Sequence, residues 1–206
     1  MKHLRTACLL LVLSFAIASL AQGTGQSAPP TPAPQAQAAP QPAPTFASVV
    51  DRQVSQYEKL MVDAAEAMPE DKFNFTPESL NIKGSEFKTV RTFAQLIKHT
   101  ATANFRYWTA LTGEKFPENI KGSNGPDELK TKAEIIQFLK DSFAVGHRAA
   151  KTLTADNVVE MVPVAKTTQP RLFLATGAVI HCGDEYGQMV EYLRMNGITP
   201  PASAGR

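Results

Sequence analysis

Residues 170–201 read PRLFLATGAVIHCGDEYGQMVEYLRMNGITPP and predict a single long helix. Pro170 is a residue favoured in the first turn of a helix, so we expect this helix to start near it. Gly197 is a natural left-handed terminator, and Pro200-Pro201 blocks continuation. We therefore expect the helix to end at Asn196.

Two earlier segments carry the 3.6-residue apolar period of an amphipathic helix. The first ends at Pro69, and one apolar stripe follows its length: Phe46, Val50, Val54, Tyr57, Met61, Ala64 and Met68. The other starts at Thr131, which forms a capping box with Glu134, and its inward face runs to Leu153. Each segment thus predicts a helix with one buried face.

A further helix is predicted between them, from about Thr89 to Leu111, with Gly113 as its stop. Its start has two registers: Thr89 is a plausible N-cap, and Thr92 with Gln95 offers a capping box three residues later. Four amphipathic helices without a sheet to cover must bury their stripes against one another. The predicted fold is therefore all-α, a four-helix bundle.

The links between the helices, residues 69–88, 113–130 and 154–169, are long for a simple up-and-down bundle. Long links allow a crossover connection, and they can also cover one end of the bundle. Residues 158–164 are the one strand-like stretch, and it is short.

The N-terminal part has the features of an export signal and a tether. Lys2 and Arg5 precede a short apolar run, and small residues end at Ala21, so residues 1–21 predict a secretory signal peptide. The alternative is an uncleaved N-terminal anchor. Residues 22–44 are rich in Pro, Ala and Gln and carry no charge, which predicts a disordered linker. The folded domain should span residues 45–206 and be exported, to the periplasm or the extracellular space, with no membrane span after cleavage.

Charge and cysteine content narrow the function classes. Removal of Lys2 and Arg5 leaves 19 of the 21 Lys and Arg residues, which equals the number of Asp and Glu residues, 19. A neutral domain lacks the clustered cations that nucleic acid binding requires, so nucleic acid is excluded as a partner. Cleavage would also leave Cys182 as a lone cysteine, which excludes an intramolecular disulfide.

Three polar residues on two of the helices form the candidate site. His181 and Glu185 lie one helical turn apart on the same face, and His99 lies on the helix of residues 89–111. Bundles build metal sites from such inward-facing ligands, and two imidazoles with a carboxylate suit zinc or non-haem iron. The structural alternative is that these side chains only make polar contacts within the bundle.

Several motifs resemble the DinB-like (DinB/YfiT-type) superfamily. The last helix carries His181, Gly187-Gln188 and Tyr192-Leu193-Arg194, followed by Gly197 and Pro200-Pro201. Earlier matches are Met68-Pro69-Glu70, Phe75-Thr76-Pro77 and Arg91-Thr92-Phe93 before His99. The resemblance covers the domain from about Phe46 and implies a four-helix bundle. It also implies a divalent metal held by three histidines, and metal-dependent transferase or hydrolase activity in some members.

Carried onto this sequence, the resemblance implies metal ligands at His99, His181 and Glu185, with Glu185 standing where the family has histidine. A carboxylate there still suits zinc, iron, nickel or manganese, whereas a decayed site is the alternative. We predict that Gln188 and Tyr192 orient a substrate.

Three function classes follow from these residues. The first is a divalent-metal-dependent hydrolase or transferase acting on a small substrate; export disfavours thiol transfer, because low-molecular-weight thiols belong to the cytoplasm. The second is a non-catalytic module that binds a metal or a ligand. The third is a structural homodimer formed through exposed stripe residues.

The remaining candidates favour structural roles. His147 lies outside the family's ligand pattern and is expected at the surface or in a structural contact. Cys182 should be a small packing residue and Asp184 a solvated acid, because both are rotated away from the face of His181. Phe105, Tyr107 and Trp108 are expected in the core.

Overall fold

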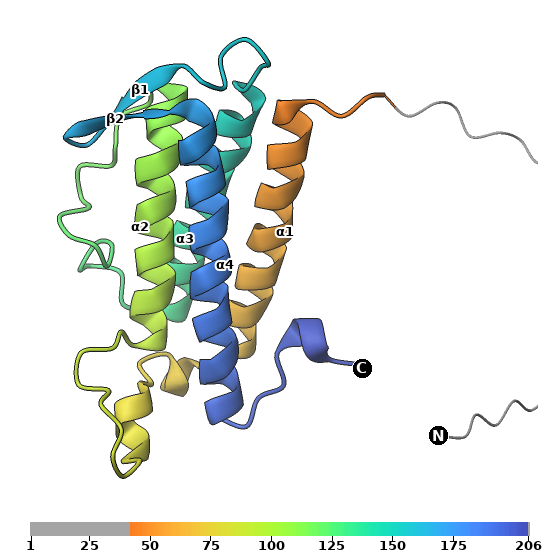
Figure 1. Ribbon diagram of the computed structural model, residues 1–206. Coiled ribbons are helices and arrows are strands. Elements are labelled where there is room, and N and C mark those ends of the chain that lie inside the picture. Colours follow the sequence, from red (N-terminus) through yellow and green to blue (C-terminus); the bar gives the residue numbers. More distant parts are fainter. Residues whose placement is uncertain (1–41, 206) are drawn as a thin grey trace, which may run out of the picture. The chain divides into compact units, whose positions relative to one another are not determined.

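The computed structural model describes residues 42–205. The predicted signal peptide and residues 22–41 of the predicted linker lie outside this range. Its main elements are four helices: α1 (Phe46–Ala67), α2 (Phe93–Thr112), α3 (Lys132–Lys151) and α4 (Arg171–Met195), which form a bundle (Figure 1). None of the helices within residues 42–205 combines the length and apolarity needed to cross a membrane.

The first three helices all begin at a capping box. Thr45 caps α1 together with Ser48, and Thr131 caps α3 together with Glu134, as predicted for α3. At α2 the Thr92 register is confirmed and the Thr89 register is wrong. The Thr92 hydroxyl accepts a hydrogen bond from the Gln95 backbone N–H, and the Gln95 side chain accepts one from the Thr92 N–H. This reciprocal pair fixes the start of the helix at Phe93.

Both ends of α4 lie within one residue of the prediction. Pro170 stands immediately before the first helical residue instead of inside the first turn. At the other end Gly197 has a φ of 73°, the left-handed conformation expected there. The Ile198 N–H donates to the Leu193 carbonyl and the Gly197 N–H to the Arg194 carbonyl, which completes a Schellman motif.

The long link between α2 and α3 makes α2 and α3 parallel. Glu114, just beyond the end of α2, pairs with Arg148 near the end of α3. The start of α3 lies beside the end of α1, where the Lys132 ammonium donates to the Met68 carbonyl. Residues 113–131 therefore run along the length of the bundle (Figure 1), so this link is a crossover connection, one of the two arrangements that its length allows.

A small β-hairpin corrects the all-α prediction. Strand β1 (Met161–Val164) pairs antiparallel with β2 (Thr167–Pro170), and β1 packs against α2. The strand-like stretch 158–164 contains β1, but β2 was missed because its sequence, TTQP, has no apolar alternation and ends in proline. Three short 3₁₀ helices complete the fold: η1 (Glu70–Lys72), η2 (Pro77–Leu80) and η3 (Pro201–Ser203).

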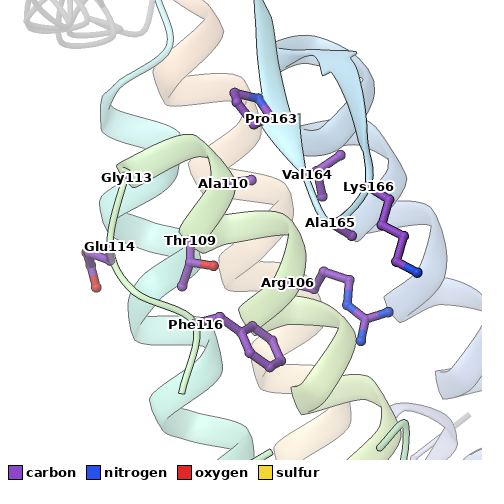
Figure 2. Close-up of a pocket in the computed structure, with 10 residues that line it drawn as sticks. All are labelled: Arg106, Thr109, Ala110, Gly113, Glu114, Phe116, Pro163, Val164, Ala165 and Lys166. Carbon is purple, nitrogen blue, oxygen red and sulfur yellow. The ribbon is translucent and has the colours of Figure 1, made fainter. Parts of the chain in front are cut away.

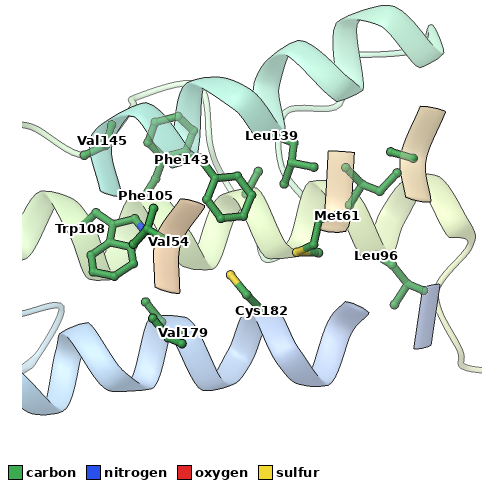
Figure 3. Close-up of a cluster of buried hydrophobic side chains, with 14 of the residues drawn as sticks. Val54, Met61, Leu96, Phe105, Trp108, Leu139, Phe143, Val145, Val179 and Cys182 are labelled. Atoms are coloured by element: carbon green, nitrogen blue, oxygen red, sulfur yellow. The ribbon is translucent and has the colours of Figure 1, made fainter. Parts of the chain in front are cut away.

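All four helices contribute side chains to one core (Figure 3). The predicted stripe of α1 faces this core, except that Phe46 is 41% exposed because it is the first residue of the helix. Trp108 is fully buried, and Gly146 of α3 lies against its indole ring. A Cβ atom at Gly146 would lie 2.9 Å from the Trp108 Nε1 atom, so this close approach of α2 and α3 depends on glycine.

Candidate metal centre

The three predicted ligands meet between α2 and α4. The Nε2 atoms of His99 and His181 lie 3.3 Å apart, and Glu185 Oε1 lies 3.6 Å from the former and 3.8 Å from the latter. Glu185 is 3% exposed, whereas both imidazoles are only partly buried. The carboxylate thus forms the floor of the cluster and the two rings border its open side.

A backbone contact fixes the orientation of the His99 ring. His99 Nδ1 lies 2.7 Å from the carbonyl oxygen of Ser123, which can only accept a hydrogen bond. The proton of a neutral His99 ring therefore lies on Nδ1, and Nε2 presents its lone pair to His181 and Glu185. Metal-ligating histidines are typically oriented in this way by a carbonyl or carboxylate behind them.

The link that carries Ser123 is itself held against α2. The Arg91 side chain donates to Asn124 Oδ1 over 2.9 Å. Gly125 has a φ of 71°, and a Cβ atom there would lie 3.1 Å from both Lys98 and Phe138. Only glycine combines this backbone conformation with such a close approach. The crossover link therefore positions the Ser123 carbonyl behind His99.

The distances within the cluster fit a bound divalent ion. Ligand atoms about 2.0–2.2 Å from a tetrahedral zinc ion lie roughly 3.3–3.6 Å from one another. The three observed separations are close to this range. In addition, His181 Nδ1 and Glu185 Oε2 are buried and form no hydrogen bond within residues 42–205. Glu185 Oε1 faces both imidazoles, and an ion bound by both oxygens of this carboxylate would also give the orphaned Oε2 a partner. The residues present could therefore hold a metal.

Burial also sets the protonation of these groups. Burial lowers the pKa of His99. It is also the main cause that lowers the pKa of His181, and the neighbouring charge of His99 lowers that pKa further. Both rings are therefore neutral near pH 7, which is the form that binds metals. Burial raises the pKa of Glu185 to about 7, although Arg91 opposes the shift. A carboxylate so disfavoured in its charged form gains most from a nearby cation.

The two predicted substrate residues lie at different depths on α4. Gln188 is exposed, one turn from Glu185. Tyr192 is buried; its ring packs edge-on against Phe75, and its hydroxyl donates to the Arg91 carbonyl over 2.9 Å. The hydroxyl of Tyr192 thus helps to join the end of α4 to the start of α2. The role of either residue toward a substrate stays a prediction.

The neighbours of His181 occupy the places expected for them. Cys182 is buried in the core, and its thiol donates to Asn104 Oδ1. Burial raises the pKa of this thiol to about 12, which removes the thiolate needed for a nucleophile or a ligand. Asp184 is exposed, as predicted for a solvated acid. Phe105 and Trp108 are core residues, and Tyr107 is partly buried.

His147 joins α3 to α1. Its Nδ1 lies 2.7 Å from an Asp51 carboxylate oxygen, and its Nε2 lies 3.0 Å from one of Glu58. Burial opposes the charged form of His147, but the hydrogen bonds to the two carboxylates outweigh it and raise the pKa of the ring. The sequence alone did not identify these partners of His147. Their spacing was a usable signal, because Asp51 and Glu58 are two turns apart on one face of α1 and can both contact one side chain.

The His147→Ala substitution is expected to cost more stability in acid than in alkali. A folded-state pKa above the unfolded value of about 6.5 stabilises the fold fully below pH 6.5 and progressively less as the pH rises through the folded-state pKa. We expect a loss of about 1 kcal/mol at pH 6 and a smaller loss at pH 9, measured by urea denaturation. Equal losses at both pH values would show that the imidazolium is not the stabilising form.

Comparisons with known proteins identify the family. The sequence profile of the DinB superfamily matches residues 53–189. The chain belongs to the DinB superfamily. A crystal structure of a DinB-like protein from Bacillus cereus superposes with a TM-score of 0.53 at 12% identity, covering 73% of this chain and 93% of that chain. At this identity the likeness shows the DinB-like fold alone. No curated protein matches the chain.

Proposed function

We propose that this DinB superfamily protein is exported and is a divalent-metal-dependent hydrolase or transferase acting on a small substrate. The observation that carries the proposal is the cluster of His99, His181 and Glu185, whose three donor atoms lie 3.3–3.8 Å apart. The hydrogen bond from His99 to the Ser123 carbonyl leaves its Nε2 free for an ion.

Zinc, iron, nickel or manganese bound there would supply Lewis-acid chemistry, by polarising a substrate oxygen or by lowering the pKa of a coordinated water or thiol. The protein would contribute orientation and access. Glu185 closes the buried side of the cluster, whereas His99 and His181 are partly exposed, so a substrate would approach from the side of the two imidazoles. Gln188, exposed one turn further along α4, would then hydrogen-bond to that substrate.

The predicted signal peptide and linker favour hydrolysis over thiol transfer. Low-molecular-weight thiol cofactors belong to the cytoplasm, whereas water is available in every compartment. Export is a proposal that rests on the sequence of residues 1–21, with its two cations, short apolar run and small residues before Ala21.

One observation favours a second candidate, a non-catalytic binding module with a degenerate metal site. A proton shared between His99 and His181 would also hold two Nε2 atoms 3.3 Å apart. With the pKa of Glu185 raised to about 7, this carboxyl is partly protonated near neutral pH and can take part in the same network. A cluster held in this way would need no ion.

Turnover distinguishes the two candidates. The metal-reconstituted protein is tested on ester, lactone, amide and phosphoester substrates, beside a chelator-treated sample. We expect hydrolysis of one class, which is lost on chelation and falls at least about 100-fold in His99→Ala. His147→Ala, which removes a histidine outside the cluster, should retain it. Bound metal with no hydrolysis of any class would favour the binding module.

A further inference from the structure

A separate cavity of about 830 Å³ lies between the C-terminal half of α2 and the tip of the β-hairpin (Figure 2). Its walls are formed by α2, by the first residues of the crossover link and by the turn between β1 and β2. None of His99, His181 and Glu185 lines it. The volume is in the range of small-molecule sites, which is roughly 300–1,000 Å³.

Two cations of the cavity lack acidic partners. Arg106 of α2 and Lys166 of the hairpin turn line it, and neither forms an ion pair within residues 42–205. Figure 2 shows both side chains extending on the same side of the cavity. The one acid in the lining, Glu114, is engaged by Arg148 through two hydrogen bonds of 2.9 and 2.8 Å. The cavity therefore carries uncompensated positive charge.

A local contact restrains Arg106, and the tight hairpin turn fixes the backbone position of Lys166. The Arg106 guanidinium lies 5.8 Å from the centre of the Phe116 ring, a cation–π contact that restrains the side chain. Lys166 is the second residue of the two-residue hairpin turn, and the φ of 50° at Ala165, the first turn residue, is the conformation that such tight turns require.

The rest of the lining is largely apolar. Ala110, Phe116, Pro163 and Val164 contribute side chains without charge or hydrogen-bonding groups. An apolar body would be taken out of water against these side chains, while a guanidinium forms paired hydrogen bonds with a carboxylate or a phosphate. A simple inorganic anion would leave this apolar wall unused.

We propose that the cavity binds a small amphipathic anion, in which an apolar chain or ring carries one carboxylate or phosphate. The head group lies between Arg106 and Lys166, and the apolar body contacts Phe116, Ala110 and Val164. The proposal does not rest on the proposed metal centre, because the two sets of lining residues are distinct and His99 is two helical turns, about 10 Å, from Arg106 along α2.

The test is calorimetric titration of the full chain with four eight-carbon probes: octanoate, octyl phosphate, octanol and octyltrimethylammonium. We expect octanoate or octyl phosphate to bind at one site, with an affinity at least about tenfold above that of the neutral and cationic probes. The anion that binds with the higher affinity shows whether the site prefers a carboxylate or a phosphate head group. Equal binding of all four probes, or no binding of either anion, would overturn the proposal.

Variants locate the binding to this cavity. The double variant Arg106→Gln/Lys166→Gln should weaken anion binding at least about tenfold, and Ala110→Leu, which fills the apolar part without changing charge, should also weaken it. Arg52→Gln/Lys83→Gln is the matched control, because it removes two exposed cations outside the lining. Unchanged binding in the first two variants, with their thermal unfolding intact, would place the anion elsewhere and contradict the proposal.

Discussion

The His181→Ala variant is expected to lose at least about 100-fold in affinity for zinc or another divalent transition metal. The change removes one of three donors that lie within 3.8 Å of one another and leaves an incomplete set of one imidazole and one carboxylate. Loss of a residue that only hydrogen-bonds to a metal ligand typically lowers metal affinity 10–100-fold, so loss of the ligand itself should lower it more. Competition with a chromophoric chelator measures the affinity.

The matched control for this variant is His147→Ala. It also deletes an imidazole from a helix, but His147 is held between Asp51 and Glu58 and lies outside the cluster. Its metal affinity should equal that of the unmodified protein. If His181→Ala binds metal as tightly as His147→Ala, the ion is held elsewhere and the cluster is a set of polar contacts.

Trp108→Ala is expected to destabilise the fold by about 3–5 kcal/mol, the largest loss of stability we predict. Trp108 is 1% exposed, and its indole fills the space between α2 and α3 that Gly146 leaves free. Removal of the ring creates a cavity that the surrounding helices fill only in part. Chemical denaturation at constant pH and salt measures the change in the free energy of unfolding.

Two further variants separate packing from hydrogen bonding at this position. The Trp108 Nε1–H is buried and has no hydrogen-bond partner within residues 42–205, so Trp108→Phe removes an unsatisfied donor along with some volume. We expect it to cost much less than Trp108→Ala. Phe173→Ala on α4, where the ring is 56% exposed, should cost under about 0.5 kcal/mol. Similar losses in all three variants would refute the core position of Trp108.

The helices could be predicted because their signals are local. The Thr131–Glu134 box and the Gly197 terminator act within one or two turns, and both are present in the structure as expected. The N-cap of α2 was ambiguous between Thr89 and Thr92 because both hydroxyls precede the same apolar stripe. The presence of Gln95 three residues after Thr92 decides between them, through a reciprocal pair of hydrogen bonds.

Long-range contacts account for what the sequence did not indicate. Strand β2 forms because β1 offers it a partner, and its own residues show no strand pattern. The Ser123 carbonyl orients His99 through a backbone atom, which any residue type supplies, so only the path of the crossover link reveals it. By contrast, the proximity of His181 and Glu185 follows directly from their spacing of one helical turn.

The central claim is that His99, His181 and Glu185 hold one divalent metal ion. Mass spectrometry of metal content tests it most directly, on protein purified without chelator or affinity tag and then reconstituted with zinc, iron, nickel and manganese in turn. We predict close to one equivalent of a single transition metal per chain. No bound metal before or after reconstitution would contradict the claim and would leave Glu185 as a member of a metal-free polar cluster.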